Sequence, residues 1–329
     1  GVVEGYSLPG RHEVDPSAVM AFFYYVLFGM MLSDAAYGIL TVVGSAFALR
    51  KFPDMELKMR KTLRMFLFCG ISTTVWGVLF GSYFGDAIPV IAQTFFHTEI
   101  TVPALWFEPL DDPMRLLIFS FGVGVAHLFT GLGVQFYQLA KQKKYADAIY
   151  DVVFWYLLVG GLIVVLLSTE IFQNIAELPF VVPGPVAAVA GVLAGIGAVG
   201  ILFTAGRESR NPVKRFLKGL YGLYGVSSYL SDILSYSRLL ALGLATSVIS
   251  TVFNQLGAML GCGVVGAIFF AVVFLIGHSM NMAINLLGAY VHTNRLQFVE
   301  VFGQFYEGGG RAYAPFAANT KHFQIKEEK

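Results

Sequence analysis

The stretch DILSYSRLLALGLATSVIS, residues 232–250, places one arginine, Arg238, inside a run that otherwise suits a lipid environment. A guanidinium group keeps its charge at any pH that a cell reaches. At the centre of a membrane span such a charge costs between about 2.5 and 17 kcal/mol, depending on its access to water. The stretch therefore predicts a membrane helix that carries a functional cation and needs an anion or water beside it.

The composition of the whole chain also indicates an integral membrane protein. Of its 329 residues, 56% are hydrophobic and only 13% are charged, whereas soluble domains contain about 25% charged residues. The net charge of +1 gives no reason to expect nucleic-acid binding. Cys69 and Cys262 are far apart in apolar surroundings, so we expect two buried thiols rather than a disulfide or a metal site.

Six apolar runs are long enough to cross a bilayer. They cover roughly residues 63–85, 114–139, 149–169, 180–205, 214–257 and 263–304. Lysine and arginine concentrate in the loops 50–64, 140–147 and 206–218, and the intervening loops carry acids instead. By the positive-inside rule, the basic loops and both ends of the chain are expected to be cytoplasmic.

Residues 17–49 allow two interpretations, namely one long helix or two short helices that meet at the polar stretch SDAAYG. We favour the helical hairpin, which makes the fold an all-α membrane protein with eight transmembrane segments. Each arm has only about 15 residues, which is short for a full span. The turn should therefore be surrounded by protein rather than lipid.

The last two apolar segments are too long for a single perpendicular crossing. Each has about 42 residues, or about 63 Å of helix at 1.5 Å per residue, against a hydrocarbon core of about 30 Å. They are expected to tilt far beyond the usual ~20°. We divide the chain into a cytoplasmic lead-in (1–16) cut from a longer chain, scaffold helices (17–205), a tilted pair (206–305) and a cytoplasmic tail (306–329).

Each of the two long segments carries a polar stripe at helical spacing. The stripe on the last segment consists of His278, Asn281, Asn285, Gly288, His292 and Arg295, and that on the preceding segment consists of Ser227, Ser228, Ser231, Ser235 and Arg238. Two simpler interpretations stay open. Serine and asparagine also serve helix packing in membranes, and an arginine near a helix end also reaches out to the headgroups.

The buried arginines need counter-charges, and few acids are available in the apolar stretches. These acids are Asp34, Asp86, Asp232 and Glu300. Asp232 lies about 240° around the helix from Arg238, which is a poor position for an ion pair. We therefore expect the chain to be short of acids for its buried bases, and the anion to come from another subunit.

At these residues the sequence resembles the C-terminal membrane domain of subunit a of V-type (vacuolar and archaeal-type) ATPases, called subunit I in bacteria and archaea. The resemblance covers essentially the whole chain. The matching motifs are FGMMLSDAAYG (28–38), SYSRLLALGLATSVIS (235–250) and HTNRLQFVEVFGQFYEGGGRAYAPF (292–316).

The resemblance implies a stator subunit whose tilted helices face a rotating ring of proteolipid subunits, in a complex with central and peripheral stalks. The essential arginine of the family corresponds to Arg238 and its second arginine to Arg295. The acid of the first helix pair corresponds to Asp34, and the histidine before the second arginine to His292. Where eukaryotic members have a glutamate and a second histidine, this chain has Asn285 and Thr246, so a particular proton relay is not carried over.

Taken together, these features predict a non-catalytic ion-translocating stator for H⁺ or Na⁺, in a prokaryotic plasma membrane, without a cofactor or a metal. His278, Asn281, Asn285 and His292 are expected to line the external half-channel. Asp232 and Ser235 are expected at the polar junction near Arg238, and Gln297 and Glu300 at the cytoplasmic mouth.

The sequence also offers two other functional interpretations. A secondary transporter would use the two arginines to bind an anionic substrate, and it predicts inverted repeats that we do not find. A purely structural anchor for a stalk would leave the arginines unexplained. The glycine pattern GIGAVG at 195–200 lies inside a span, and no phosphate-binding loop is present, so we expect no ATP hydrolysis in this chain.

Overall fold

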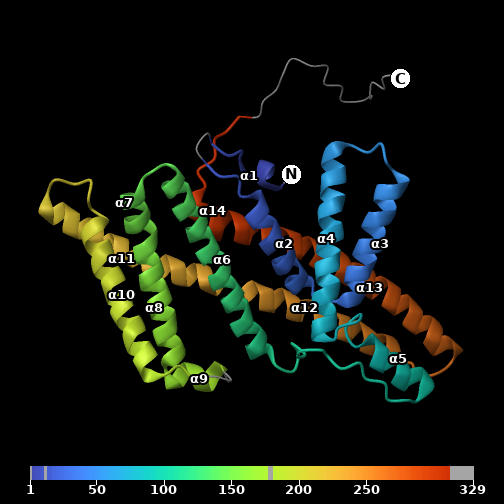
Figure 1. Ribbon diagram of the computed structural model, residues 1–329. Coiled ribbons are helices and arrows are strands. Elements are labelled where there is room, and N and C mark those ends of the chain that lie inside the picture. The colour runs from blue at the N-terminus through green and yellow to red at the C-terminus, as the bar shows by residue number, and fades with distance from the viewer. Residues whose placement is uncertain (1, 11–12, 177–180, 312–329) are drawn as a thin grey trace, which may run out of the picture.

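The computed structural model describes residues 2–10, 13–176 and 181–311, and this part of the chain is helical without any strand (Figure 1). Six helical segments in it are long and apolar enough to cross a membrane. They are α4 (Leu57–Phe80), α6 (Pro113–Lys141), α7–α8 (Tyr145–Ser168), α10 (Gly184–Thr204), α11–α12 (Pro212–Ala258) and α13–α14 (Val264–Phe305). The six predicted spans are thus confirmed, with shifted ends, while the total of eight stays a prediction.

Residues 17–49 form two helices rather than one. α2 (Ser17–Leu32) and α3 (Ala35–Lys51) are separated by Ser33, whose φ of 37° is left-handed, and by Asp34. Asp34 begins α3 because its side-chain oxygen accepts hydrogen bonds from the backbone N–H groups of Ala36 and Tyr37. Figure 1 shows α2 and α3 running in opposite directions, as predicted for the hairpin.

α4 packs against both arms of the hairpin at glycines, where backbones approach closely. A β-carbon at Gly77 would lie 2.0 Å from the backbone nitrogen of Ala35, and one at Gly29 would lie 2.3 Å from the Ser72 hydroxyl oxygen. Small residues permit this approach between membrane helices. The hairpin turn is consequently enclosed by protein, with Ser33 and Asp34 both buried.

Three shorter helices were not predicted: α1 (Val2–Tyr6), α5 (Ala87–Phe96) and α9 (Glu170–Ala176). α1 lies beside α14 (Phe302–Phe305), where the Tyr6 ring stacks on Phe298 and the Tyr306 hydroxyl donates to the Ser7 carbonyl. Of the predicted tail 306–329, only residues 306–311 are among those described. Cys69 is buried as expected, but Cys262 is exposed at the turn before α13, so the expectation of a buried thiol there is wrong.

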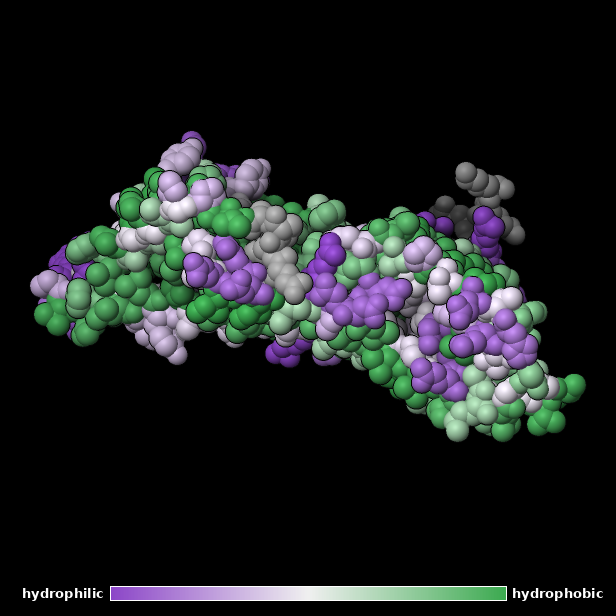
Figure 2. All heavy atoms as spheres, turned by 90° about the horizontal axis from the view of Figure 1, so that it is seen from below, coloured by the Kyte–Doolittle hydropathy of each residue, from purple (hydrophilic) through white to green (hydrophobic). Residues whose placement is uncertain are grey.

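The loops divide between two ends of the molecule (Figure 1). The α3–α4, α6–α7 and α10–α11 loops, which carry the lysines and arginines, lie at one end together with α1; we call this the basic-loop end. α5 and α9 lie at the opposite, acidic-loop end. Seen from there, the molecule is elongated, with hydrophilic patches across this end and hydrophobic residues along much of its rim (Figure 2).

The two long segments run obliquely across the other four (Figure 1), and each is interrupted beside its arginine. α11 (Pro212–Ser235) ends one residue before Tyr236, and α12 (Ser237–Ala258) begins just before Arg238. α13 (Val264–Arg295) ends at Arg295 and continues into the π-helical turn η2 (Leu296–Val301). Such π-turns inside helices are frequent at functional sites.

One histidine of α6 connects the two interruptions. His127 Nδ1 lies 2.7 Å from the Tyr236 hydroxyl and its Nε2 lies 3.1 Å from Gln297 Oε1. With Gln297 Oε1 as acceptor, Nε2 carries the hydrogen and Nδ1 accepts from the tyrosine. All three side chains are fully buried. We call this trio the His127 latch, since it holds the break in α11–α12 and the π-turn against α6.

The close approach of α4 to the hairpin turn gives a stability prediction. We expect Gly77→Ala to lower stability by about 1–3 kcal/mol, because the added methyl group would collide with the Ala35 backbone. Thermal unfolding in mild detergent measures this effect. Gly44→Ala in α3 is the matched control, since nothing lies within 4 Å of its β-carbon position; equal unfolding temperatures for the two variants would contradict the prediction.

The His127 latch gives a second prediction. Tyr236→Phe keeps the buried ring but leaves His127 Nδ1 without its donor, which should cost about 1–3 kcal/mol. The same unfolding measurement applies. Tyr221→Phe is the control, because Tyr221 lies on the preceding helix with its side chain 79% exposed. If the His127 latch does not stabilise the fold, both variants will unfold at the wild-type temperature, which would contradict the prediction.

Candidate functional site

A chain of hydrogen-bonded polar side chains begins near the acidic-loop end of α12 and α13. Asp86, which precedes α5, accepts a hydrogen bond of 2.9 Å from Asn254 Nδ2. The same amide nitrogen donates to the carbonyl of Phe84 at 2.8 Å. Asn254 Oδ1 in turn lies 2.9 Å from His278 Nε2 on α13. The loop acid is therefore connected to the first residue of the predicted stripe.

The chain continues from His278 into the middle of α13. His278 Nδ1 lies 2.7 Å from the hydroxyl of Tyr37, and Asn281 Nδ2 donates to the same hydroxyl at 3.0 Å. Asn281 also donates to Ser250 Oγ at 2.9 Å. Asn285 Nδ2 donates to the Asn281 carbonyl at 2.9 Å. We call the connected residues the polar chain: Asp86, Asn254, His278, Tyr37, Ser250, Asn281 and Asn285.

The helical stripe predicted on α13 is confirmed as a shared face along part of its length. His278, Asn281 and Asn285 are all buried, and their polar groups have partners, as buried polar groups normally do. Further along, His292 is half-buried and Arg295 is exposed. The stripe thus passes from the protein interior to the surface between Asn285 and Arg295.

A cavity of about 230 Å³ lies where the polar chain begins. Its lining includes Asp86, Glu108, Ser247 and Thr251. Thr251 Oγ1 is buried without a partner among the described residues, so it is available to water in the cavity. Burial raises the pKa of Glu108, and the neighbouring charge of Asp111 raises it further. The cavity therefore has room and polar groups for water and reaches Asp86, and we call it the acidic vestibule.

Asp34 is not a member of the polar chain. Its hydrogen bonds instead stabilise the start of α3 and the loop after α4. One of its oxygens accepts from the N–H groups of Ala36, Tyr37 and Phe84, and the other from Ser82 Oγ and the Gly85 N–H. Its side chain is buried and saturated with donors. Because Asp34 caps the helix on which Tyr37 lies, it positions the tyrosine that joins His278 to Asn281.

Arg238 has a carboxylate partner within its own chain. Its Nη1 lies 3.6 Å from Glu300 Oε1, and the two side chains are 24% and 2% exposed. The expectation that the chain lacks an acid for Arg238 is therefore wrong. Sequence spacing did not reveal the pair because Glu300 lies on η2, a separate segment that packs alongside the break at Tyr236 through the His127 latch.

The ion pair of Arg238 leaves hydrogen-bonding capacity unused. Several buried polar atoms around the two interruptions have no partner among the described residues, namely Arg238 Nη1, His292 Nδ1, Asn294 Oδ1, Gln297 Nε2, Glu300 Oε2, Gln304 Nε2 and Gln304 Oε1. Buried polar groups without partners are costly and usually bind water or another molecule. This region, which we call the basic-end cluster, is therefore suited to hold water.

The remaining predicted residues are more exposed. Arg295 is exposed and makes no ion pair with a described residue. Asp232 is half-buried and is not paired with Arg238 in the described part of the chain, in agreement with its unfavourable helical angle. The Ser235 hydroxyl donates to the Ser231 carbonyl at 3.1 Å. The serine stripe of α11 lies mainly on the outside, with Ser227, Ser228 and Ser231 all exposed.

The sequence interpretation missed four residues that the fold brings into the site: His127, Tyr37, Ser250 and Asn254. A signal existed on α12, where Thr246, Ser250 and Asn254 follow one another at four-residue spacing on the buried face. The polar stripe predicted on this segment instead ended at Arg238 and did not include these three residues. For His127 and Tyr37 no local pattern points to the site.

Comparisons with known proteins place both arginines in a segment that matches a protein family. Residues 226–318, which contain α12, α13 and both arginines, match the model of the V-type ATPase 116kDa subunit family. The chain is 31% identical to an A-type ATP synthase subunit I of Methanocaldococcus jannaschii, over 98% of this chain and 47% of the relative. It is 32% identical to the protein of that name from Pyrococcus horikoshii, over 99% and 47%.

A bacterial relative is more distant. The V-type ATP synthase subunit I of Chlamydia pneumoniae is 24% identical, over 95% of this chain and 52% of the relative. The chain thus spans about half the length of the curated relatives it matches. The described part of the chain contains six helices long and apolar enough to span a membrane, and both arginines lie in the matched segment; this chain belongs to the V-type ATPase 116kDa subunit family.

Proposed function

We propose that this chain is the ion-translocating stator of a rotary ATPase, in which Arg238 acts on carboxylates of a rotating proteolipid ring. The observation that carries the proposal is the position of Arg238, a permanent cation at a helix interruption, one quarter exposed and next to a buried carboxylate. Its relatives carry the names of ATP synthase subunits. The basic loops would be cytoplasmic, and the membrane a prokaryotic plasma membrane.

The acidic vestibule and the polar chain support an external half-channel. An ion would enter the cavity beside Glu108 and Asp86 and pass along the hydroxyl and amide groups toward Asn285. His278 Nε2 donates to Asn254 Oδ1, and the Tyr37 hydroxyl donates to His278 Nδ1. The histidine ring and the tyrosine hydroxyl therefore carry exchangeable hydrogens through which a proton would be relayed. Oxygen atoms of the same groups would also suit a sodium ion.

The basic-end cluster supports a second half-channel toward the other side. Its unpartnered atoms lie on Arg238 and on the segment from His292 to Gln304, close to the end where α1 and α14 meet. Water bound there would give an ion released from a ring carboxylate a path to the basic-loop end. The segment between Asn285 and Arg295 then separates the two half-channels.

Arg238 would perform two tasks between the half-channels. Its charge favours the ionised form of a nearby ring carboxylate, which releases the bound ion, and it repels cations that would otherwise leak directly across. The contact with Glu300, at 3.6 Å and without a hydrogen bond, holds the side chain without saturating it. A guanidinium group with five donors can therefore retain Glu300 and still contact a ring carboxylate.

The external partners follow from the same arrangement. The proteolipid ring would lie against the α11–α12 and α13 pair, where Ser231 and Arg295 are exposed beside Arg238. Central and peripheral stalk subunits would complete the complex at the basic-loop end. This part of the protein would be non-catalytic, with ATP turnover in other subunits.

Arg238→Ala tests the proposal directly. We expect ATP-driven ion pumping to be abolished in vesicles reconstituted with the assembled complex, because the cation that displaces the ion is lost. Proton- or sodium-sensitive fluorescence in the vesicle lumen measures pumping, and subunit stoichiometry on a gel measures assembly. Arg64→Ala, an exposed arginine on α4, is the control. Normal coupled transport by the Arg238→Ala complex would refute the assignment.

Asn285→Leu tests the external half-channel. The substitution removes the donor to the Asn281 carbonyl, so we expect ion flux to fall about tenfold, as an added barrier of about 1.4 kcal/mol would cause. Assembly should be normal. Ala283→Leu places the same side chain at an exposed position on α13 and should pump at the wild-type rate. A wild-type rate for Asn285→Leu would remove this residue from the pathway.

A further inference from the structure

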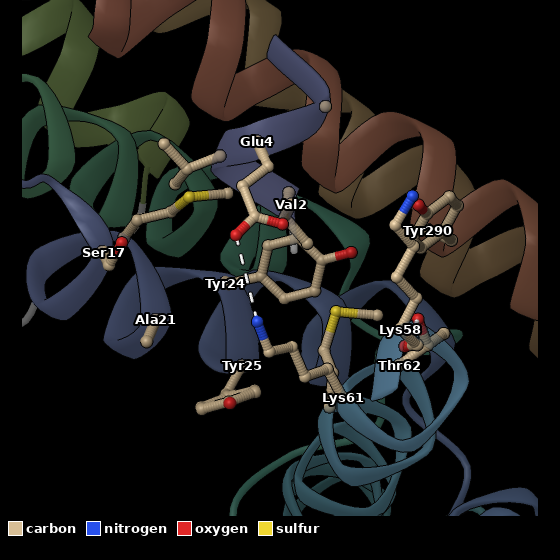
Figure 3. Close-up of a pocket in the computed structure, with 14 residues that line it drawn as sticks. Val2, Glu4, Ser17, Ala21, Tyr24, Tyr25, Lys58, Lys61, Thr62 and Tyr290 are labelled. Carbon is tan, nitrogen blue, oxygen red and sulfur yellow. Dashed lines mark hydrogen bonds and ion pairs between the residues drawn. The ribbon is translucent and has the colours of Figure 1, made fainter. Parts of the chain in front are cut away.

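A second cavity lies away from the ion pathway, between α1, α2, α4 and α13 (Figure 3). Its volume is about 560 Å³, larger than that of the acidic vestibule. The residues that line it come from the basic-loop ends of α2 and α4, from α1, and from Tyr290 on α13. It therefore opens where these helices leave the proposed membrane, on the side of the basic loops.

The lining of this cavity is amphipathic. Its apolar part consists of Val2, Val3, Met20, Ala21 and Met65. Its polar part consists of the hydroxyl groups of Ser17, Tyr24, Tyr25, Thr62 and Tyr290 and the charged groups of Glu4, Lys58 and Lys61. An occupant that matches it needs an apolar part and a polar part that accepts hydrogen bonds.

Tyr24 is the buried polar group of the cavity that lacks a partner. Its side chain is 2% exposed, and its hydroxyl has no hydrogen-bond partner among the described residues. Buried tyrosine hydroxyls usually have a partner. Figure 3 shows the Tyr24 ring between the helices that line the cavity, in the neighbourhood of Glu4 and Lys61. The unpaired Tyr24 hydroxyl indicates that a molecule outside this chain supplies its hydrogen-bond partner.

The charges at the mouth favour an anion. Lys61 pairs with Glu4 at 3.9 Å, but both side chains are about half exposed, at 51% and 53%, so the pair is weak. Lys58, one helical turn earlier, makes no ion pair with a described residue. Its long apolar stem permits the ammonium group to reach a headgroup while the stem stays in the apolar part. The same end of α4 adds Arg60 and Arg64, which are both exposed.

We propose that this cavity is a binding site for one anionic phospholipid of the surrounding bilayer. The phosphate lies between Lys58, Lys61 and Thr62, and an apolar chain lies against Met20, Ala21 and Met65. Basic pockets between membrane helices on the cytoplasmic side have the chemistry to bind such headgroups. The apolar lining favours a lipid over a free phosphate ion, which would gain nothing from those residues.

Such a lipid would join elements that belong to different parts of the fold. It would contact the hairpin helix α2, the scaffold helix α4, and α13 through Tyr290. This site depends only on the membrane position of these helices and is independent of the proposed ion transport. A negative result for one proposal therefore leaves the other unaffected.

The test uses the assembled complex in vesicles of phosphatidylcholine that contain a small amount of phosphatidylglycerol with a photoreactive diazirine on one chain. After illumination, mass spectrometry locates the labelled peptides. We expect labelling in α2 around Met20 and in α4 around Met65, reduced by unlabelled phosphatidylglycerol but not by glycerol phosphate. Labelling elsewhere only, or equal labelling by a diazirine phosphatidylcholine, would overturn the proposal.

Two variants identify the cavity as the site. Lys58→Gln removes an exposed charge without burying a new group and should reduce labelling about fivefold. Ala21→Trp fills the apolar part and should abolish it. Lys144→Gln, an exposed lysine of the α6–α7 loop, is the control and should label as wild type. Wild-type labelling of a folded Lys58→Gln complex would refute the role assigned to this residue.

Discussion

The structure depends on keeping a permanent positive charge at a place where two mainly apolar helices cross. Arg238 cannot neutralise itself, so its surroundings have to supply a carboxylate and room for water. Glu300 supplies the carboxylate at 3.6 Å, and unpartnered buried polar atoms surround the pair. Both long segments depart from regular α-helix beside this pair, at Tyr236 and in η2.

The rest of the fold serves to hold these interruptions in place. His127 of α6 bonds to Tyr236 at one break and to Gln297 at the other. Without these hydrogen bonds, the helix break beside Arg238 would not be restricted to one geometry. At the other end of the molecule, Asp34 has a comparable role. Three donors of the α4–α5 loop and two N–H groups at the start of α3 bind its carboxylate and so position Tyr37. Two buried polar side chains thereby connect the scaffold helices to the polar groups of α12 and α13.

The two polar regions differ in a way that suits their proposed tasks. The polar chain from Asp86 to Asn285 is internally satisfied, so its geometry is defined by the protein alone. The basic-end cluster is not satisfied, so it depends on water or on groups of a partner. An ordered entry path and a hydrated exit on opposite sides of a fixed cation are what a ring carboxylate would need to exchange its ion. The amphipathic cavity near Lys58 is lined by other residues than those of the two regions and opens at the basic-loop end.

The sequence alone determined the membrane class, the six long segments and the shared face of His278, Asn281 and Asn285, and it favoured a break at Ser33 and Asp34 over one long helix. These features follow from local hydropathy and helical period, which act over a few turns. Only the tertiary structure decided that Glu300 is the partner of Arg238, that His127 joins the two interruptions, and that Tyr37 links His278 to Asn281. Each of these contacts joins segments that are remote in sequence, and the break at Tyr236 interrupts the regular period of the helix. The helical periodicity of the sequence predicts neither these contacts nor the break, because the packing of separate helices determines which faces meet.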